Sequence, residues 1–249
     1  MTAQCPMVAS LAMYPFPALR AATNELWRAI RRNLGWGPDA LEWGIVTPQV
    51  WHHPDLLIAQ TCGWPLVTQL VDSVVVVGTF DYEVDGSAEG TYHSVLVSSH
   101  EATLAQLRAR PDLTAAVNGF DSLSGWVSLQ HTLGAPPRTL ETGAHFASIG
   151  ALIAGDADIA AIDGVSWTLI SEHEPDLVAG LHVVGHGPTI PCLPLVAGLR
   201  HSVDVPALRT AIRAALAEPS LAATLRTLHI RGFVPCEMAD YLPIRALMA

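Results

Sequence analysis

The chain has 249 residues, half of them hydrophobic and only 14% charged, which supplies a large core and argues against a disordered protein. The length allows one large domain or two smaller ones. The net charge is −10 and every basic residue is an arginine, so binding of nucleic acid through a basic face is disfavoured. No apolar run is long enough to span a bilayer.

Short apolar runs alternate with helical patterns along the chain. In chain order, strands are predicted at residues 7–14, 56–59, 73–80, 92–98, 114–117, 159–162, 181–184 and 193–197. Helices are predicted at 17–33, 62–70, 103–109, 122–133, 144–154, 165–171, 206–217 and 220–228, and a last one from Met238. This alternation predicts an α/β fold with mostly parallel sheets flanked by helices. Ligands of such folds bind at the carboxyl ends of strands, beside helix N-termini.

The sequence NGFDSLSGW, residues 118–126, joins a predicted strand to a predicted helix. Backbone N–H groups at a helix start, together with serine hydroxyls, can hold an oxyanion. Asp and Ser are also preferred at helix N-caps. An ordinary cap, made by Asp121, is therefore the second interpretation of this stretch.

Cysteine and histidine give little support for a metal centre. Cys5, Cys62, Cys192 and Cys236 are widely spaced and contain no CxxC pair, which argues against structural zinc. We expect buried thiols, with one disulfide as the alternative. The eleven histidines form no HExxH motif. No metal and no cofactor are expected.

Four stretches carry a family resemblance when they are read together: DLLIAQTCGWPL (55–66), TYHSVLVSS (91–99), AVNGFDSLSGW (116–126) and ETGAHFASIGALIAGDADIAAIDGVSW (141–167). In this order and spacing the chain resembles the phosphonate/phosphite-type substrate-binding proteins of ABC transporters, which have the type II periplasmic binding-protein fold. The resemblance extends from Val8 to about Tyr241. It implies a binding protein without enzymatic activity that passes a small, anionic, phosphonate- or phosphite-like ligand to an ABC permease.

The resemblance also implies a two-lobed organisation with the ligand in a cleft between the lobes. Lobe 1 would consist of residues 1–83 and 190–249, and lobe 2 of residues 84–189. The strands that cross between them would lie near residues 80–91 and 185–192.

In lobe 2, the resemblance places the grip on the ligand's oxygens at Ser122, Ser124 and Gly125. Leu123 stands where the family often has a threonine, so one hydroxyl is missing. Tyr92 matches a family tyrosine at the start of the crossing strand, and a half-buried strand aromatic is the alternative. His145 stands where some members carry a carboxylate, and a structural histidine is the alternative.

Asp163 closes the predicted strand DIAAID and matches a family aspartate that reaches the ligand or orients groups beside it. Its alternative role is to cap the following helix. In lobe 1, Tyr14 and Trp64 follow predicted strands, and Trp64 would form an apolar wall for the ligand's substituent. A core position is the alternative for Trp64.

Other functions remain open to test. A serine hydrolase could use Ser122 or Ser124 with His145 and Asp163, but neither serine lies in a G-x-S-x-G motif, and the chain order of the three residue types differs from that of hydrolases. The resemblance implies a periplasmic location. The N-terminal stretch MTAQCPMVASLAMYPFP has no basic n-region and is not expected to be a secretion signal. A cytoplasmic ligand-binding or sensing protein of the same fold is therefore the alternative.

Overall fold

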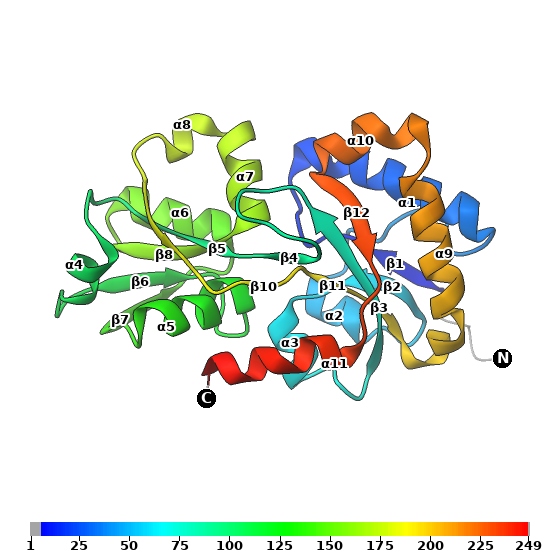
Figure 1. Ribbon diagram of the computed structural model, residues 1–249, viewed down its shortest axis with the longest axis horizontal. Coiled ribbons are helices and arrows are strands. Elements are labelled where there is room, and N and C mark those ends of the chain that lie inside the picture. The colour runs from blue at the N-terminus through cyan, green and yellow to red at the C-terminus, as the bar shows by residue number, and fades with distance from the viewer. Residues whose placement is uncertain (1–5, 249) are drawn as a thin grey trace. The chain divides into compact units, whose positions relative to one another are not determined.

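The computed structural model describes residues 6–248 and contains two compact α/β units (Figure 1). Unit 1 holds the residues up to Glu83, Ala88–Gly90 and Pro191–Leu242, and unit 2 holds Val84–Ser87, Thr91–Ile190 and the residues from Pro243. The predicted lobes assigned this last segment to lobe 1. The division into two units does not test whether a cleft closes on a ligand, so that cleft stays a prediction.

Unit 1 is built on a mixed sheet of five strands in the order β1-β2-β11-β3-β12. β1 and β2 are parallel, whereas β11 runs antiparallel to both β2 and β3, and β12 antiparallel to β3. All five side chains of β2 are buried, which places this strand in the core. The bounds are β1 Val8–Ser10, β2 Leu56–Gln60, β3 Val74–Tyr82, β11 Pro194–Gly198 and β12 Ile230–Val234.

Three helices of unit 1 pack on one another: α1 (Arg20–Leu34), α9 (Val205–Leu216) and α10 (Ala222–Thr227). The buried face of α1 carries Leu26, Trp27 and Ile30 at helical spacing. Gly35 ends α1 with a φ of 83°, and its N–H donates to the Arg31 carbonyl. The other helices of the unit are α2 Thr47–Trp51, α3 Gly63–Thr68 and α11 Met238–Tyr241, and short 3₁₀ turns lie at Pro17–Leu19, Leu199–Asp204 and Pro219–Leu221.

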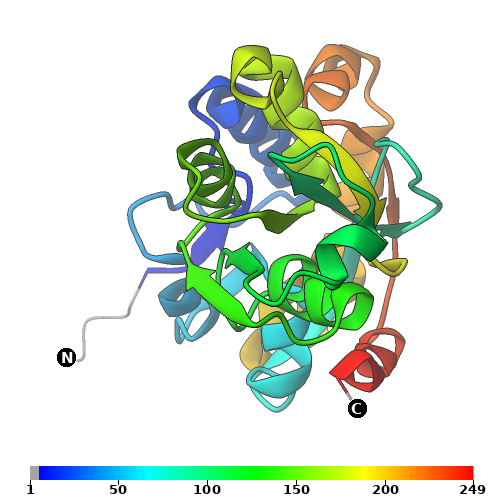
Figure 2. The ribbon, with the colours of Figure 1, turned by 90° about the vertical axis from the view of Figure 1, so that its left-hand side faces the viewer.

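Unit 2 has a second mixed sheet, in the order β7-β6-β8-β5-β9. β6 lies parallel to β7 and β8, and β5 runs antiparallel to β8 and β9. Figures 1 and 2 show its helices around this sheet. The bounds are β5 Ser94–Ser98, β6 Thr114–Val117, β7 Arg138–Glu141, β8 Ile159–Asp163, β9 His182–His186, α4 Leu104–Arg108, α5 Ser128–Leu133, α6 His145–Ala154, α7 Gly164–His173 and α8 Pro175–Val178.

A separate two-stranded sheet pairs β4 (Thr91–Tyr92) with β10 (Ile190–Pro191), and these strands lie where the chain passes between units. The chain leaves β4 into β5 and β10 into β11. β5 therefore begins at the edge where β8 ends, and β11 begins at the edge where β2 ends. Each of these two strands runs antiparallel to that neighbour. This connectivity explains why the sheets are mixed, and not mostly parallel as predicted, although the predicted α/β class is confirmed.

Most elements lie where the sequence predicts them, with shifted ends. The sequence did not predict α2, α8, β7, β10 or β12. β7 is exposed at all four residues, so it has no buried face to produce an alternating pattern. A glycine interrupts β12, and this weakens its strand signal.

Gly164 provides a test of close packing in unit 2. A Cβ atom at Gly164 would lie 2.5 Å from the His93 carbonyl oxygen, whereas one at Gly150, within α6, would meet nothing within 4 Å. We expect Gly164→Ala to lower the free energy of unfolding by about 1–3 kcal/mol. Gly150→Ala should leave it unchanged or raise it by up to about 1 kcal/mol. Denaturant unfolding of both variants measures this, and equal stabilities would contradict the close contact.

Candidate ligand site

The predicted site residues of unit 2 gather at one edge of its sheet. β6, β7 and β8 are parallel, so their carboxyl ends meet at this edge, and the antiparallel β5 begins there. Ser122 and Ser124 follow β6, His145 follows β7, and Asp163 ends β8. Tyr92 lies two residues before β5. This is where ligands of α/β proteins bind.

Ser122 caps the helix that follows β6. Its Oγ accepts a hydrogen bond from the Gly125 N–H at 2.9 Å. Its carbonyl accepts from Trp126 and Val127 at 3.1 and 3.0 Å, which forms a π-helical turn over Leu123–Val127 that continues into α5. Such turns are frequent at functional sites.

This cap corrects one expectation. Asp121 is exposed, and the capping residue is Ser122. The Gly125 N–H, which the sequence assigned to an anion, already donates to Ser122. Ligand contacts from Ser122 and Gly125 therefore stay predictions that require this bond to be shared or broken.

Gly125 is also fixed by its neighbour Asn118. A Cβ atom at Gly125 would lie 1.9 Å from Asn118 Oδ1, so the amide packs directly on the helix start. Within the described chain, Asn118 Oδ1 is buried without a hydrogen-bond partner. Asn118 was not predicted as a site residue, because no spacing rule connects it with Gly125.

Ser124 and His145 form the central contact of the site. Ser124 Oγ lies 3.1 Å from His145 Nε2. The backbone of Ser124 is held as well, since Ser94 Oγ donates to its carbonyl at 2.7 Å. Ser94 was not predicted, although it lies two residues from Tyr92, on the same face of the strand predicted at residues 92–98.

His145 is kept neutral by its surroundings. Burial lowers the pKa of the imidazole, and the nearby negative charge of Asp163 opposes this effect in part. A neutral imidazole has one donor and one acceptor nitrogen. If Nε2 carries the proton, it donates to Ser124 Oγ, and the hydroxyl hydrogen of Ser124 is then available to an anion.

Asp163 has two structural roles, and the sequence predicted both: it caps the helix that follows, and it orients a neighbouring group. Asp163 is 3% exposed. Oδ1 accepts from the Ser166 N–H at 2.8 Å and caps α7, while Oδ2 accepts from the Tyr92 hydroxyl at 2.6 Å. Asp163 therefore orients Tyr92, which is 1% exposed. Direct ligand contact by either residue stays a prediction.

These contacts do not assemble a serine-hydrolase triad. Both oxygens of Asp163 serve Tyr92 and Ser166. Among the described residues, no carboxylate is a hydrogen-bond partner of His145 Nδ1. The imidazole therefore lacks the acid that would orient it as a general base for Ser124.

Tyr14 and Trp64 belong to unit 1. They follow the parallel strands β1 and β2 and thus lie at the carboxyl edge of that sheet. The ring of Tyr14 meets Tyr82 edge-on at 5.7 Å, and the Tyr82 hydroxyl accepts from Gln60 Nε2 at 2.9 Å. Trp64 is only partly buried at the start of α3, as a wall residue would be. Their contact with a ligand stays a prediction.

The described residues contain no group of three or more His, Cys, Asp or Glu side chains placed to hold a metal. His182 and His186 are four residues apart, but they lie on strand β9, where this spacing separates them by about 13 Å. Cys62, Cys192 and Cys236 are thiols. Cys5 lies outside the described residues.

Two α/β units with hydrogen-bond donors at a sheet edge are the features of a solute-binding protein. The family model for the periplasmic substrate-binding protein of the phosphonate ABC transporter matches residues 55–241. The chain belongs to this family, whose members bind a solute for ABC-type uptake and are not enzymes. No curated protein sequence matches the chain significantly.

Solved structures share the fold at low sequence identity. A binding-protein component of an ABC phosphonate transporter from Pseudomonas aeruginosa is 17% identical, with a TM-score of 0.75 over 98% of this chain and 85% of that one. A protein from Prochlorococcus marinus in complex with methylphosphonate is 15% identical, with a TM-score of 0.76 over 97% and 96%. A protein from Rhodopseudomonas palustris with bound malate is 13% identical, with a TM-score of 0.59 over 98% and 94%. Across residues 6–248, we find no helix that combines the length and apolar character of a membrane span.

The lowered pKa of His145 gives a test of its burial. As the pH falls through about 6.5, the unfolded chain takes up a proton before the folded chain does. The stability that neutral His145 contributes is thus complete above this pH and is lost below it. We expect His145→Gln to make the loss of stability between pH 7 and pH 5 shallower, by less than about 1.4 kcal/mol per pH unit.

His131→Gln, at an exposed position of α5, is the matched control and should retain the parental slope. Burial and His186 also lower the pKa of His93, so part of the slope survives in both variants. Denaturant unfolding across the pH range measures the slopes. Indistinguishable slopes for the parent and His145→Gln would contradict a buried, neutral His145.

Proposed function

We propose that this chain captures a small phosphonate- or phosphite-like oxyanion at the carboxyl edge of the unit 2 sheet. The observation that carries the proposal is the part-buried contact between Ser124 Oγ and His145 Nε2, placed at a helix start. The hydroxyl supplies a donor, and the helix start adds a favourable field for negative charge. Tyr92, oriented by Asp163, lies at the same edge.

Neutral donors suit this task because the chain has no lysine, and two arginines of unit 2 lie away from the site. Arg110 pairs with Asp158 at 2.8 Å, and Arg138 begins β7 at the opposite end of the strand from the site. An oxyanion held by hydroxyls and N–H groups is recognised by the geometry of its oxygens. The oxygen-rich head group is thus the part of the ligand that these residues select.

We infer further that Tyr14 and Trp64 of unit 1 face the same ligand across a cleft, and that the loaded protein docks on an ABC permease in the periplasm. The family assignment supports this transport role. Fractionation of cells that express the gene from its own start codon tests the location. A purely cytosolic product would favour a sensing role for the same site.

The ligand class is tested by thermal melting with phosphite, alkylphosphonates, phosphate and sulfonates. A ligand at a hundred times its Kd adds about 2.7 kcal/mol to the free energy of unfolding. We expect phosphite or a phosphonate to raise the melting temperature most. The absence of a shift with every oxyanion would overturn the proposed ligand class.

Ser124→Ala tests the position of the site. Loss of a buried hydrogen bond to a charged ligand should weaken binding roughly ten- to a hundredfold. Ser122→Ala removes the helix cap and should lower the free energy of unfolding by about 1 kcal/mol with a smaller loss of affinity. Asp121→Ala should change neither quantity appreciably. Calorimetric titration and thermal melting of the three variants separate the effects, and parental affinity in Ser124→Ala would show that the site is misplaced.

A further inference from the structure

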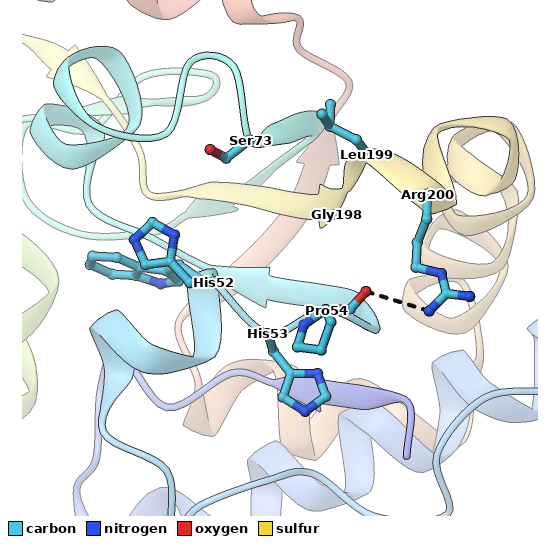
Figure 3. Close-up of a pocket in the computed structure, with 8 residues that line it drawn as sticks. His52, His53, Pro54, Ser73, Gly198, Leu199 and Arg200 are labelled. Carbon is cyan, nitrogen blue, oxygen red and sulfur yellow. Dashed lines mark hydrogen bonds between the residues drawn. The ribbon is translucent and has the colours of Figure 1, made fainter. Parts of the chain in front are cut away.

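Unit 1 has a hollow at the opposite edge of its sheet from Tyr14 and Trp64. β2 and β3 begin there and the antiparallel β11 ends there. The hollow has a volume of about 310 Å³. Figure 3 shows its lining residues, which are Trp51, His52, His53, Pro54, Ser73, Gly198, Leu199 and Arg200.

The polar groups of this hollow are mainly hydrogen-bond donors. Arg200 is 57% exposed at its side chain and makes only long contacts, at 3.5 Å, to the Pro54 carbonyl and to Asp55. Within residues 6–248, neither the ring of His52 nor the hydroxyl of Ser73 makes a hydrogen bond. Because both contacts of Arg200 are long, most of the N–H donors of its guanidinium group are unused.

No acidic residue lines the hollow. Asp55, next to Pro54 in the chain, is engaged by His201 Nε2 at 2.7 Å as well as by Arg200. His201 also contacts Asp204 at 2.8 Å through Nδ1. In a chain with a net charge of −10, an arginine beside a hollow with no acidic lining residue forms a local site for negative charge. His53 adds no donor at Nδ1, because this atom accepts from the Asp55 N–H at 3.2 Å.

The same hollow has apolar walls. The indole of Trp51 is fixed, because Nε1 donates to the Gln60 carbonyl at 2.9 Å. Leu199 is 52% exposed although it is aliphatic, and Pro54 lies across from it (Figure 3). Fixed apolar walls with a few polar donors are the usual composition of a small-molecule site.

We propose that this hollow is a second binding site, for a small organic oxyanion with a short apolar body. Arg200 and His52 bind the carboxylate or phosphate group, and Trp51, Pro54 and Leu199 contact the apolar part. The site is independent of Ser124 and His145, which belong to unit 2. The anionic group of the ligand is either a carboxylate or a phosphate. Benzoate and phenyl phosphate, used as separate probes, distinguish these two groups.

The experiment is an NMR titration of the full chain, observing the Trp51 indole N–H, the His52 ring and the Arg200 Nε–H. Benzoate or phenyl phosphate should shift these three signals together with one Kd. Benzyl alcohol lacks the charge and inorganic phosphate lacks the apolar body, so both should bind more weakly. Absence of any shift with both aromatic anions at millimolar concentration would overturn the proposal.

Arg200→Gln should weaken binding by about fivefold or more, because it removes a charged donor. Arg138→Gln, at the exposed β7 of unit 2, is the matched control and should bind like the parent. Leu199→Asp places a carboxylate on the rim without disturbing the core, and should weaken both anions but not benzyl alcohol. Equal affinities in Arg200→Gln and Arg138→Gln would place the anion elsewhere.

Discussion

The candidate site of unit 2 depends on the buried carboxylate of Asp163. This group ends β8, caps α7 and holds the hydroxyl of Tyr92, so it joins three segments at one sheet edge. A buried carboxylate is costly unless its oxygens are hydrogen-bonded. Here a phenol, a backbone N–H and the helix start supply that compensation. Loss of the hydrogen bond from Tyr92 or from Ser166 would leave the buried charge of Asp163 with less compensation.

The same negative charge acts on His145. It opposes the effect of burial on the imidazole, and the proton on Nε2 or Nδ1 determines whether Ser124 donates or accepts. Asp163 therefore acts on the imidazole that contacts Ser124 without contacting the hydroxyl itself. This coupling distinguishes the site from an ordinary helix cap, which Ser122 alone would provide.

The sequence predicted those features that local patterning determines. A strand ending in Asp163 and a serine-rich helix start both follow from short-range spacing. It could not predict which residue, Asp121 or Ser122, would cap the helix, because both are good caps and the backbone path decides. Ser94 was missed because its contact with Ser124 joins segments 30 residues apart in sequence. Asn118 was missed because no spacing rule connects it with Gly125. The exposed β7 was missed because it lacks a buried face.

The two edges of an α/β sheet present different chemistry, and the two anion-binding sites proposed here follow that difference. At the carboxyl edge of unit 2, helix starts supply a field that favours negative charge, so the site proposed there relies on hydroxyls and a neutral imidazole. The hollow of unit 1 lies at the end of α2, where His52 follows the last residue, Trp51. A helix end carries negative partial charge. An anion bound there needs a cationic side chain to offset it, and Arg200 is the group that can do so.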